Sequence, residues 1–189
     1  AVDRVYATLV EAMILVLAVI WLFLGSFRAA LIPAVTVPVC LVAAFIALYA
    51  FDFSINLLTL LALVLCIGLV VDDAIVVVEN VERVMTFEGL APKPATQKAM
   101  TQITGAVVAI TVVLAAVFIP SALQGGAAGE IYKQFALTIA ISMAFSAFLA
   151  LGFTPALCAT MLKPLKKGEH HVAHRGLAGR FFNGFNRGF

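Results

Sequence analysis

Two adjacent carboxylates, Asp72 and Asp73, interrupt an apolar run and constrain this chain more than any other feature of its sequence. Of the 22 residues from 57 to 78, 15 are Leu, Ile or Val, so the run offers the acids almost nothing polar. The whole chain is similar, with 63% hydrophobic residues, 12% charged residues and a mean hydropathy of +1.12. Because soluble domains carry about a quarter charged residues, this composition indicates a membrane protein.

Uncharged runs of about 18 residues or more predict membrane-spanning helices. The runs here predict an all-α membrane protein, a polytopic bundle of five transmembrane helices within residues 1–165. We expect spans at about residues 5–25, 29–50, 56–81, 101–120 and 134–162. The connection at 79–102 is charged and is expected to be a partly helical, solvated elbow broken by Pro92 and Pro94. The chain begins without Met and stops on a polar tail, so we expect it to be part of a longer protein.

The basic residues predict the orientation of the bundle. If the five spans alternate in direction, ten of the twelve Lys and Arg residues fall on one side, and only Arg4 and Lys133 fall on the other. By the positive-inside rule the basic side is cytoplasmic. The N-terminal end is therefore expected outside and the C-terminal end inside.

The last segment, residues 166–189, is expected to be a cytoplasmic linker followed by an amphipathic interfacial helix. Its phenylalanines share one helical face, opposite Arg180 and Arg187, as in helices that lie in the headgroup plane; they are Phe181, Phe182, Phe185 and Phe189. The three histidines nearby favour a solvated linker over a metal site; they are His170, His171 and His174. The three cysteines lack CxxC spacing and are predicted to be small core hydrophobes; they are Cys40, Cys66 and Cys158.

The helix that carries the acids can still enter the bilayer. A charged Asp at the centre of a span costs about 2.5–3.5 kcal/mol, whereas each Leu, Ile or Val returns about 0.3–0.6 kcal/mol. Asp73 lies about 8 Å inside Val78, too deep for its short side chain to reach the interface. The acids must therefore face a bundle interior or a wet cavity. Alternatively, one helix ends near Val70 and Asp72 caps a new one, but no Gly or Pro follows Gly68 to break the run.

No cation in this chain can neutralise the pair from within the membrane, because its expected spans contain no Lys, Arg or His. Either a proton resides on the acids or a cation comes from helices outside this chain, and both cases predict a proton-coupling site. Adjacent helix positions point about 100° apart, which disfavours two carboxylates clamping one water. Val76 and Val77 stand where a Mg²⁺-diphosphate enzyme would want another acid. The alternatives left open are a membrane-embedded Asp-dependent enzyme and a non-transporting structural membrane fragment.

The segment "GLVVDDAIVVVENVERVM" strongly resembles the fourth transmembrane helix of resistance-nodulation-division (RND) transporters, the multidrug exporters of the AcrB/MexB type. The stretch "LVEAMILVLAVIWLFLGSFRAALIPAVTVPV" resembles the second helix and its turn into the third. "FSINLLTL" resembles the start of the fourth helix, and "TPALCATMLKP" the end of the sixth. The resemblance covers about Val5 to Lys167, so the chain is similar to helices two to six of a twelve-helix transporter.

This resemblance implies a proton-driven antiporter that exports hydrophobic and amphiphilic compounds. Asp72 and Asp73 match the acids that take protons from the periplasm, and Glu11 matches an acid to which we assign at most a minor role. The implied partners are an intramembrane Lys from the other half of the protein, two further copies in a homotrimer, a periplasmic adaptor and an outer-membrane channel. We expect a multi-pass protein of the bacterial inner membrane with its N-terminal end periplasmic. We expect no metal, no cofactor besides the coupling protons, and no nucleic-acid partner.

Overall fold

A computed structural model describes residues 2–24, 26–123 and 125–164. These residues form helices and connecting turns, without strands. The six helices are α1 (Val2–Leu24), α2 (Phe27–Ala50), α3 (Leu57–Glu88), α4 (Pro92–Ala122), α5 (Ala127–Leu151) and α6 (Phe153–Met161). The fold of the described residues is therefore the expected all-α bundle.

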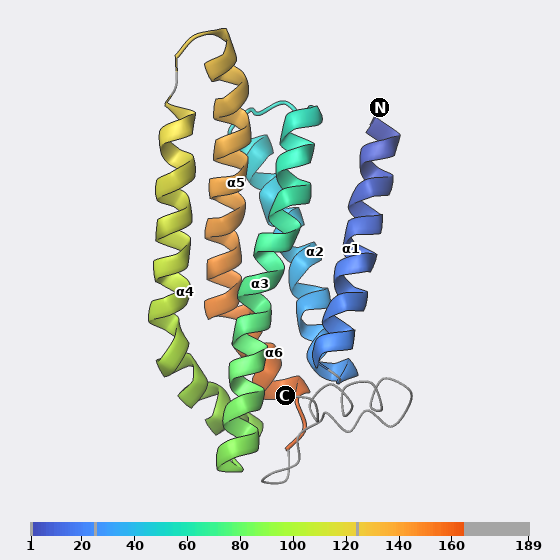
Figure 1. Cartoon of the computed structure of the whole chain (residues 1–189), viewed down its shortest axis with the longest axis vertical. Coiled ribbons are helices and arrows are strands. Elements are labelled where there is room, and N and C mark those ends of the chain that lie inside the picture. The colour runs from blue at the N-terminus through green and yellow to red at the C-terminus, as the bar shows by residue number, and fades with distance from the viewer. Residues whose placement is uncertain (1, 25, 124, 165–189) are drawn as a thin grey trace, which may run out of the picture.

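Helix α3 lies at the centre of the bundle and contacts each of the other five helices. Figure 1 shows α1 to α5 running along a common axis, with the short α6 at the end where α1 turns into α2. Helix α1 packs only against α2 and α3 among the described helices, and α4 packs against α3, α5 and α6. The helix that carries the two acids thus touches every other helix of the described chain.

Small residues let the helices approach one another closely. Five of the fully buried alanines lie on α2, α3 and α4, as expected where close packing rather than water exclusion drives association; they are Ala29, Ala44, Ala62, Ala74 and Ala99. Larger apolar side chains of α3 fill the space between them, among them Leu63, Ile67, Val77 and Val81. The three cysteines are buried and free, which confirms the expectation that they are core residues.

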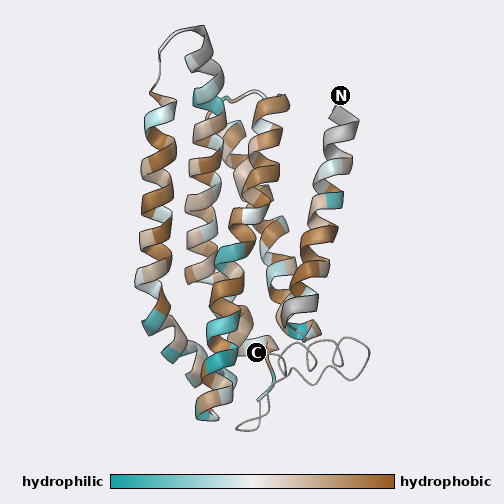
Figure 2. Ribbon diagram, viewed as in Figure 1, coloured by the Kyte–Doolittle hydropathy of each residue, from teal (hydrophilic) through white to brown (hydrophobic). Residues whose placement is uncertain are grey.

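Four segments of the described chain are long and apolar enough to cross a membrane: α2, α3, α4 and the stretch Tyr132–Met161. Figure 2 shows their middle portions mostly hydrophobic, apart from a hydrophilic stretch midway along α3, with other hydrophilic residues toward the ends. Helix α1 has a shorter apolar stretch, Val10–Trp21. Its place beside α2 and α3 is compatible with a fifth span, which stays a prediction.

Helix α3 is continuous for 32 residues, from Leu57 to Glu88. At its start the Asn56 side chain accepts hydrogen bonds from the amides of Leu58 and Thr59, at 2.9 and 3.0 Å. At its end Gly89 adopts a left-handed conformation with φ of 67°, which glycine accommodates without strain. The alternative of two helices with Asp72 as a cap is therefore wrong.

The connection between α3 and α4 is much tighter than the elbow expected at residues 79–102. Helix α3 runs seven residues beyond the expected end at 81, and α4 begins at Pro92. Proline suits the first turn of a helix, where its missing N–H would have no partner, so Pro92 starts a helix instead of breaking one. Only residues 89–91 connect the two helices.

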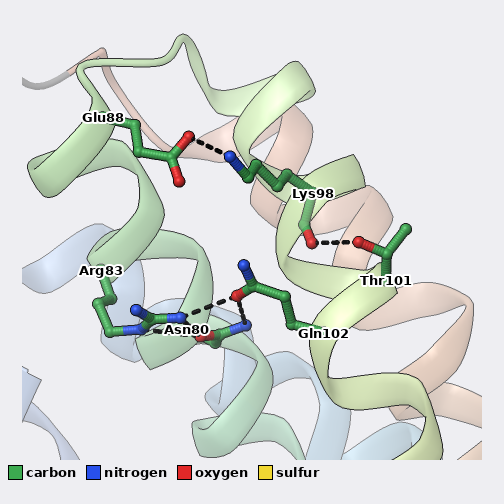
Figure 3. Close-up of polar contacts among 6 residues, drawn as sticks. All are labelled: Asn80, Arg83, Glu88, Lys98, Thr101 and Gln102. Carbon is green, nitrogen blue, oxygen red and sulfur yellow. Dashed lines mark hydrogen bonds and ion pairs between the residues drawn. The ribbon is translucent and has the colours of Figure 1, made fainter.

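Polar side chains hold this turn together (Figure 3). The Lys98 ammonium lies 2.7 Å from Glu88. The Asn80 amide also donates to the carbonyl of Ala99 at 3.1 Å. Arg83 donates to the side-chain oxygens of Asn80 and Gln102, both at 2.8 Å. These contacts fix the end of α3 against the start of α4.

The last expected span, 134–162, is interrupted at Gly152, which separates α5 from α6. Pro155 lacks the N–H that would donate to the carbonyl of Leu151 in a continuous helix, and its ring crowds that carbonyl. The break therefore falls just before the proline. The amphipathic tail helix and the three tail histidines lie outside the described residues.

Candidate functional site

The two acids lie next to each other on α3 but face different surroundings. Asp73 is half-buried, and Asp72 is exposed. Because consecutive residues of a helix point about 100° apart, the side chain of one is turned into the bundle and that of the other away from it. The two carboxylates are thus not equivalent.

Asp73 is held by a serine from a distant part of the chain. The Ser146 hydroxyl on α5 donates a 2.6 Å hydrogen bond to Oδ2 of Asp73. Ser146 is only 2% exposed, so this contact lies inside the packed bundle. A short hydrogen bond to a carboxylate is among the stronger polar contacts in proteins, and this one fixes the position of Asp73 relative to α5.

Ser146 was not singled out from the sequence. The signal available was a row of polar residues at four-residue spacing within an apolar helix, Thr138, Ser142 and Ser146. Such spacing places them on one face of α5. The first two donate to carbonyls of their own helix, at 2.6 and 2.8 Å, whereas Ser146 donates to an acid on α3.

Asp72 lies halfway along an uncovered face of α3. Exposed residues recur there every three or four positions, which is the period of a single helix face; they are Leu57, Leu61, Leu65, Gly68, Asp72, Val76, Glu79 and Arg83. We call these eight residues the open face of α3. A methyl group added at Gly68 would meet no atom within 4 Å, so this part of the face leaves room for another element.

Neither acid has a cation partner in the part of the chain that the structure describes. The ion pair there joins Lys98 to Glu88, which is the last residue of α3. No hydrogen bond from another described residue reaches Asp72. The site therefore consists of one acid held by a hydroxyl and a second acid presented on an apolar surface.

The sequence profile of the AcrB/AcrD/AcrF family matches residues 1–189 of this chain. The chain belongs to this family. It is 58% identical over 189 residues to the toluene efflux pump membrane transporter TtgB of Pseudomonas putida, and 54% identical over 189 residues to the multidrug export protein AcrF of Escherichia coli. It is also 55% identical over 170 residues, 90% of its length, to the multidrug resistance protein MdtF of Escherichia coli.

The chain spans about 18% of the length of TtgB and of AcrF, and 16% of MdtF. Family membership confirms the resemblance on which the sequence interpretation depended, that of an RND transporter of the AcrB type. The part of an AcrB/AcrD/AcrF protein represented here includes the central helix with its acid pair.

Glu11 lies on a different helix from the acid pair. It is exposed on α1, in a shallow apolar groove with Ala7, Val10, Ile14 and Leu15. The structure describes no hydrogen bond or ion pair that links Glu11 to Asp72 or Asp73. A minor role for Glu11 stays a prediction.

The acid pair does not resemble a metal centre within the described residues. No group of three or more His, Cys, Asp or Glu side chains gathers there. The hydrogen bond described at Asp73 comes from the Ser146 hydroxyl, and the structure describes no second carboxylate from another helix bonded to either acid. This arrangement suits groups that bind and release protons more than groups that activate a shared water.

Proposed function

We propose that this chain is the proton-coupling part of a proton-driven antiporter that exports hydrophobic and amphiphilic compounds. The observation that carries the proposal is the acid pair in the middle of a continuous spanning helix without a cation partner among the described residues. Ionisable residues inside a membrane are costly and mark proton or ion pathways in most proteins that have them. Relatives named as a toluene efflux pump membrane transporter and a multidrug export protein support a function in export.

In this proposal the two acids have different tasks. Asp73, tied to Ser146, is the fixed member of the pair, and Asp72 on the open face is the member that meets a cation from the rest of the protein. When both acids are ionised they attract that cation, and when protons neutralise them the attraction is lost. Proton binding thus changes how α3 packs against its partner.

The transmembrane potential can drive such a cycle. Moving one charge across 100 mV is worth about 2.3 kcal/mol, and a change of about 1.4 kcal/mol shifts an equilibrium tenfold. One proton per cycle is therefore enough to bias two packing arrangements strongly. The reaction needs no cofactor besides the proton itself.

The open face of α3 is the surface on which we expect the cation to arrive. Its apolar residues flank Asp72 on both sides, so a helix lying along it would bury Leu61, Leu65 and Val76 while placing a basic side chain against the acid. We expect a lysine from the half of the protein not contained in this chain. A homotrimer, a periplasmic adaptor and an outer-membrane channel complete the proposal, with the basic end of the bundle in the cytoplasm.

Efflux by cells that express the full-length protein tests this function. Asp72→Asn and Asp73→Asn keep the size of each side chain and remove its ability to ionise, so each is expected to abolish efflux of a fluorescent amphiphilic dye. Glu79→Gln is the matched control, because Glu79 lies on the same open face, about two turns nearer the end of α3. Efflux by the control at the wild-type rate, with both Asn variants inactive, supports the proposal. Wild-type efflux by both Asn variants contradicts it.

A further inference from the structure

A pocket with charged residues in its lining joins three separate segments of the chain at the basic end of the bundle. It has a volume of about 330 Å³ and lies between the α1–α2 turn, α3 and the segment after α6. Figure 1 shows these segments meeting at the end where α1 turns into α2. Four polar or charged side chains line it: Ser26, Arg28, Glu82 and Lys163.

The two cations of this pocket have no acidic partner among the described residues. Arg28 donates to the carbonyl of Met161 at 3.4 Å, a long hydrogen bond to a neutral group. Lys163 is exposed, and neither cation forms an ion pair within the part of the chain that the structure describes. Both are therefore available to an anionic group.

The carboxylate of this pocket also lacks an oppositely charged partner within the described chain. Glu82 is half-buried, and its Oε1 accepts a hydrogen bond from the Ser26 hydroxyl at 3.3 Å. No Lys or Arg of the described residues lies within ion-pair distance of it. A carboxylate that is partly removed from water is stabilised most by a cation. The pocket can therefore bind an anionic group through Arg28 and Lys163, and a cationic group through Glu82.

An apolar groove adjoins this pocket and shares Phe27 with it. The groove has a volume of about 360 Å³ and lies between α1 and α2. From Phe27 to Ala34 it follows α2 for about 10 Å toward the middle of the bundle. Its other walls include Trp21, which is 56% exposed, and Trp is enriched where membrane meets water. The lining residues are Leu17, Trp21, Phe27, Ala30, Leu31 and Ala34.

We propose that the pocket and the groove together bind one phospholipid whose headgroup carries both a phosphate and a primary ammonium group. Arg28 and Lys163 bind the phosphate, Glu82 accepts hydrogen bonds from the ammonium, and one acyl chain lies in the groove along α1 and α2. The charges match group by group, and charge-assisted hydrogen bonds of both kinds are strong. A headgroup with a phosphate alone would leave Glu82 without a cation, and a quaternary ammonium would have no N–H to donate.

Lipid binding to the full-length protein tests this proposal. The detergent-purified protein is titrated with phosphatidylethanolamine, phosphatidylglycerol or phosphatidylcholine of identical acyl chains, and native mass spectrometry gives the Kd of the first lipid bound. We expect phosphatidylethanolamine to bind about tenfold more tightly than either of the others. Equal affinity for the three lipids would overturn the proposal, and this comparison depends on no variant.

Variants then test each contact. Glu82→Gln is expected to remove the preference for phosphatidylethanolamine over phosphatidylcholine. The double variant Arg28→Gln with Lys163→Gln is expected to weaken the binding of all three lipids. The matched controls are Glu79→Gln for the acid and Arg83→Gln with Lys98→Gln for the bases, since these residues lie at the same end of the bundle but outside the pocket. Thermal unfolding identifies folded variants, and Glu82→Asp, which withdraws the carboxylate by one methylene, replaces a Gln variant that fails to fold. A loss of preference in Glu79→Gln as large as that in Glu82→Gln would also overturn the assignment.

Discussion

The hydroxyl of Ser146 on α5 donates a 2.6 Å hydrogen bond to Asp73 on α3, across 73 positions of sequence. Through this contact the half-buried acid is fixed to a neighbouring helix, while Asp72 beside it faces the open side of the bundle. The difference between the two carboxylates follows from one helical step of about 100°. It gives each acid a separate role in the proposed proton cycle.

Replacing Ser146 by Ala removes this hydrogen bond and leaves the neighbouring packing almost unchanged. Hydrogen bonds to charged groups contribute about 1.5–3 kcal/mol, so we expect the rate of dye efflux by the full-length protein to fall about tenfold or more. Ser142→Ala is the matched control, because Ser142 lies one turn earlier and bonds its own helix at Thr138. Equal rates in the Ser146 and Ser142 variants would show that the contact has no part in transport.

Replacing Asn56 by Ala removes the cap of α3. The Asn56 oxygen accepts from the amides of Leu58 and Thr59, and losing such a cap costs about 1 kcal/mol. We expect a lower denaturation midpoint of the full-length protein in mixed detergent micelles. Asn56→Asp keeps the accepting oxygen but loses the amide group that donates to Gln134 at 2.8 Å. If the cap stabilises α3, the denaturation midpoint of Asn56→Asp should lie close to that of the wild type. A midpoint of Asn56→Asp as low as that of Asn56→Ala would exclude this explanation.

Replacing Gly89 by Val strains the end of α3. The backbone there has φ of 67°, a conformation that costs a β-branched residue about 1–2 kcal/mol or more. The same denaturation assay should show a clear loss of stability for Gly89→Val and a smaller loss for Gly89→Asn, since Asn tolerates this conformation. No difference between Val and Asn would mean that the turn between α3 and α4 relaxes freely.

Replacing Lys98 by Met should change little. The Lys98–Glu88 pair is short at 2.7 Å, but its side chains are 49% and 36% exposed. Exposed pairs of this kind contribute about 0.2–1 kcal/mol, and salt screens them. We expect a shift in the denaturation midpoint that disappears at high ionic strength. A large shift that salt does not reduce would indicate that the pair is more buried in the full-length protein.

The all-α class and the helical setting of the acids could be predicted because they depend on long apolar runs. Four spanning segments and the continuous helix around Asp72 and Asp73 follow from uncharged length and from the absence of Gly or Pro after Gly68. The turn at residues 89–91 was predicted poorly, because Pro92 can either break a helix or begin one. The choice depends on the packing of α4 against α3 and α5.

The acid pair could be found from the sequence, but its asymmetry could not. Which of two adjacent residues faces inward depends on how α3 is rotated against α5, and a helix apolar on every side does not reveal its rotation. Ser146 was missed for a similar reason, since Ser142 and Ser146 look alike in sequence and only one reaches Asp73. The groups of opposite charge at Glu82, Arg28 and Lys163 come from three segments that only the fold brings together.

Proton movement measured in proteoliposomes tests the central claim most directly. The full-length protein is reconstituted with a pH-sensitive dye inside the vesicles, and an exported compound is added on one side to drive proton exchange. We predict a substrate-dependent pH change in the wild type and in Glu79→Gln, and none in Asp72→Asn or Asp73→Asn. A substrate-dependent pH change of wild-type size in both Asn variants would contradict the assignment of this acid pair as the proton carrier.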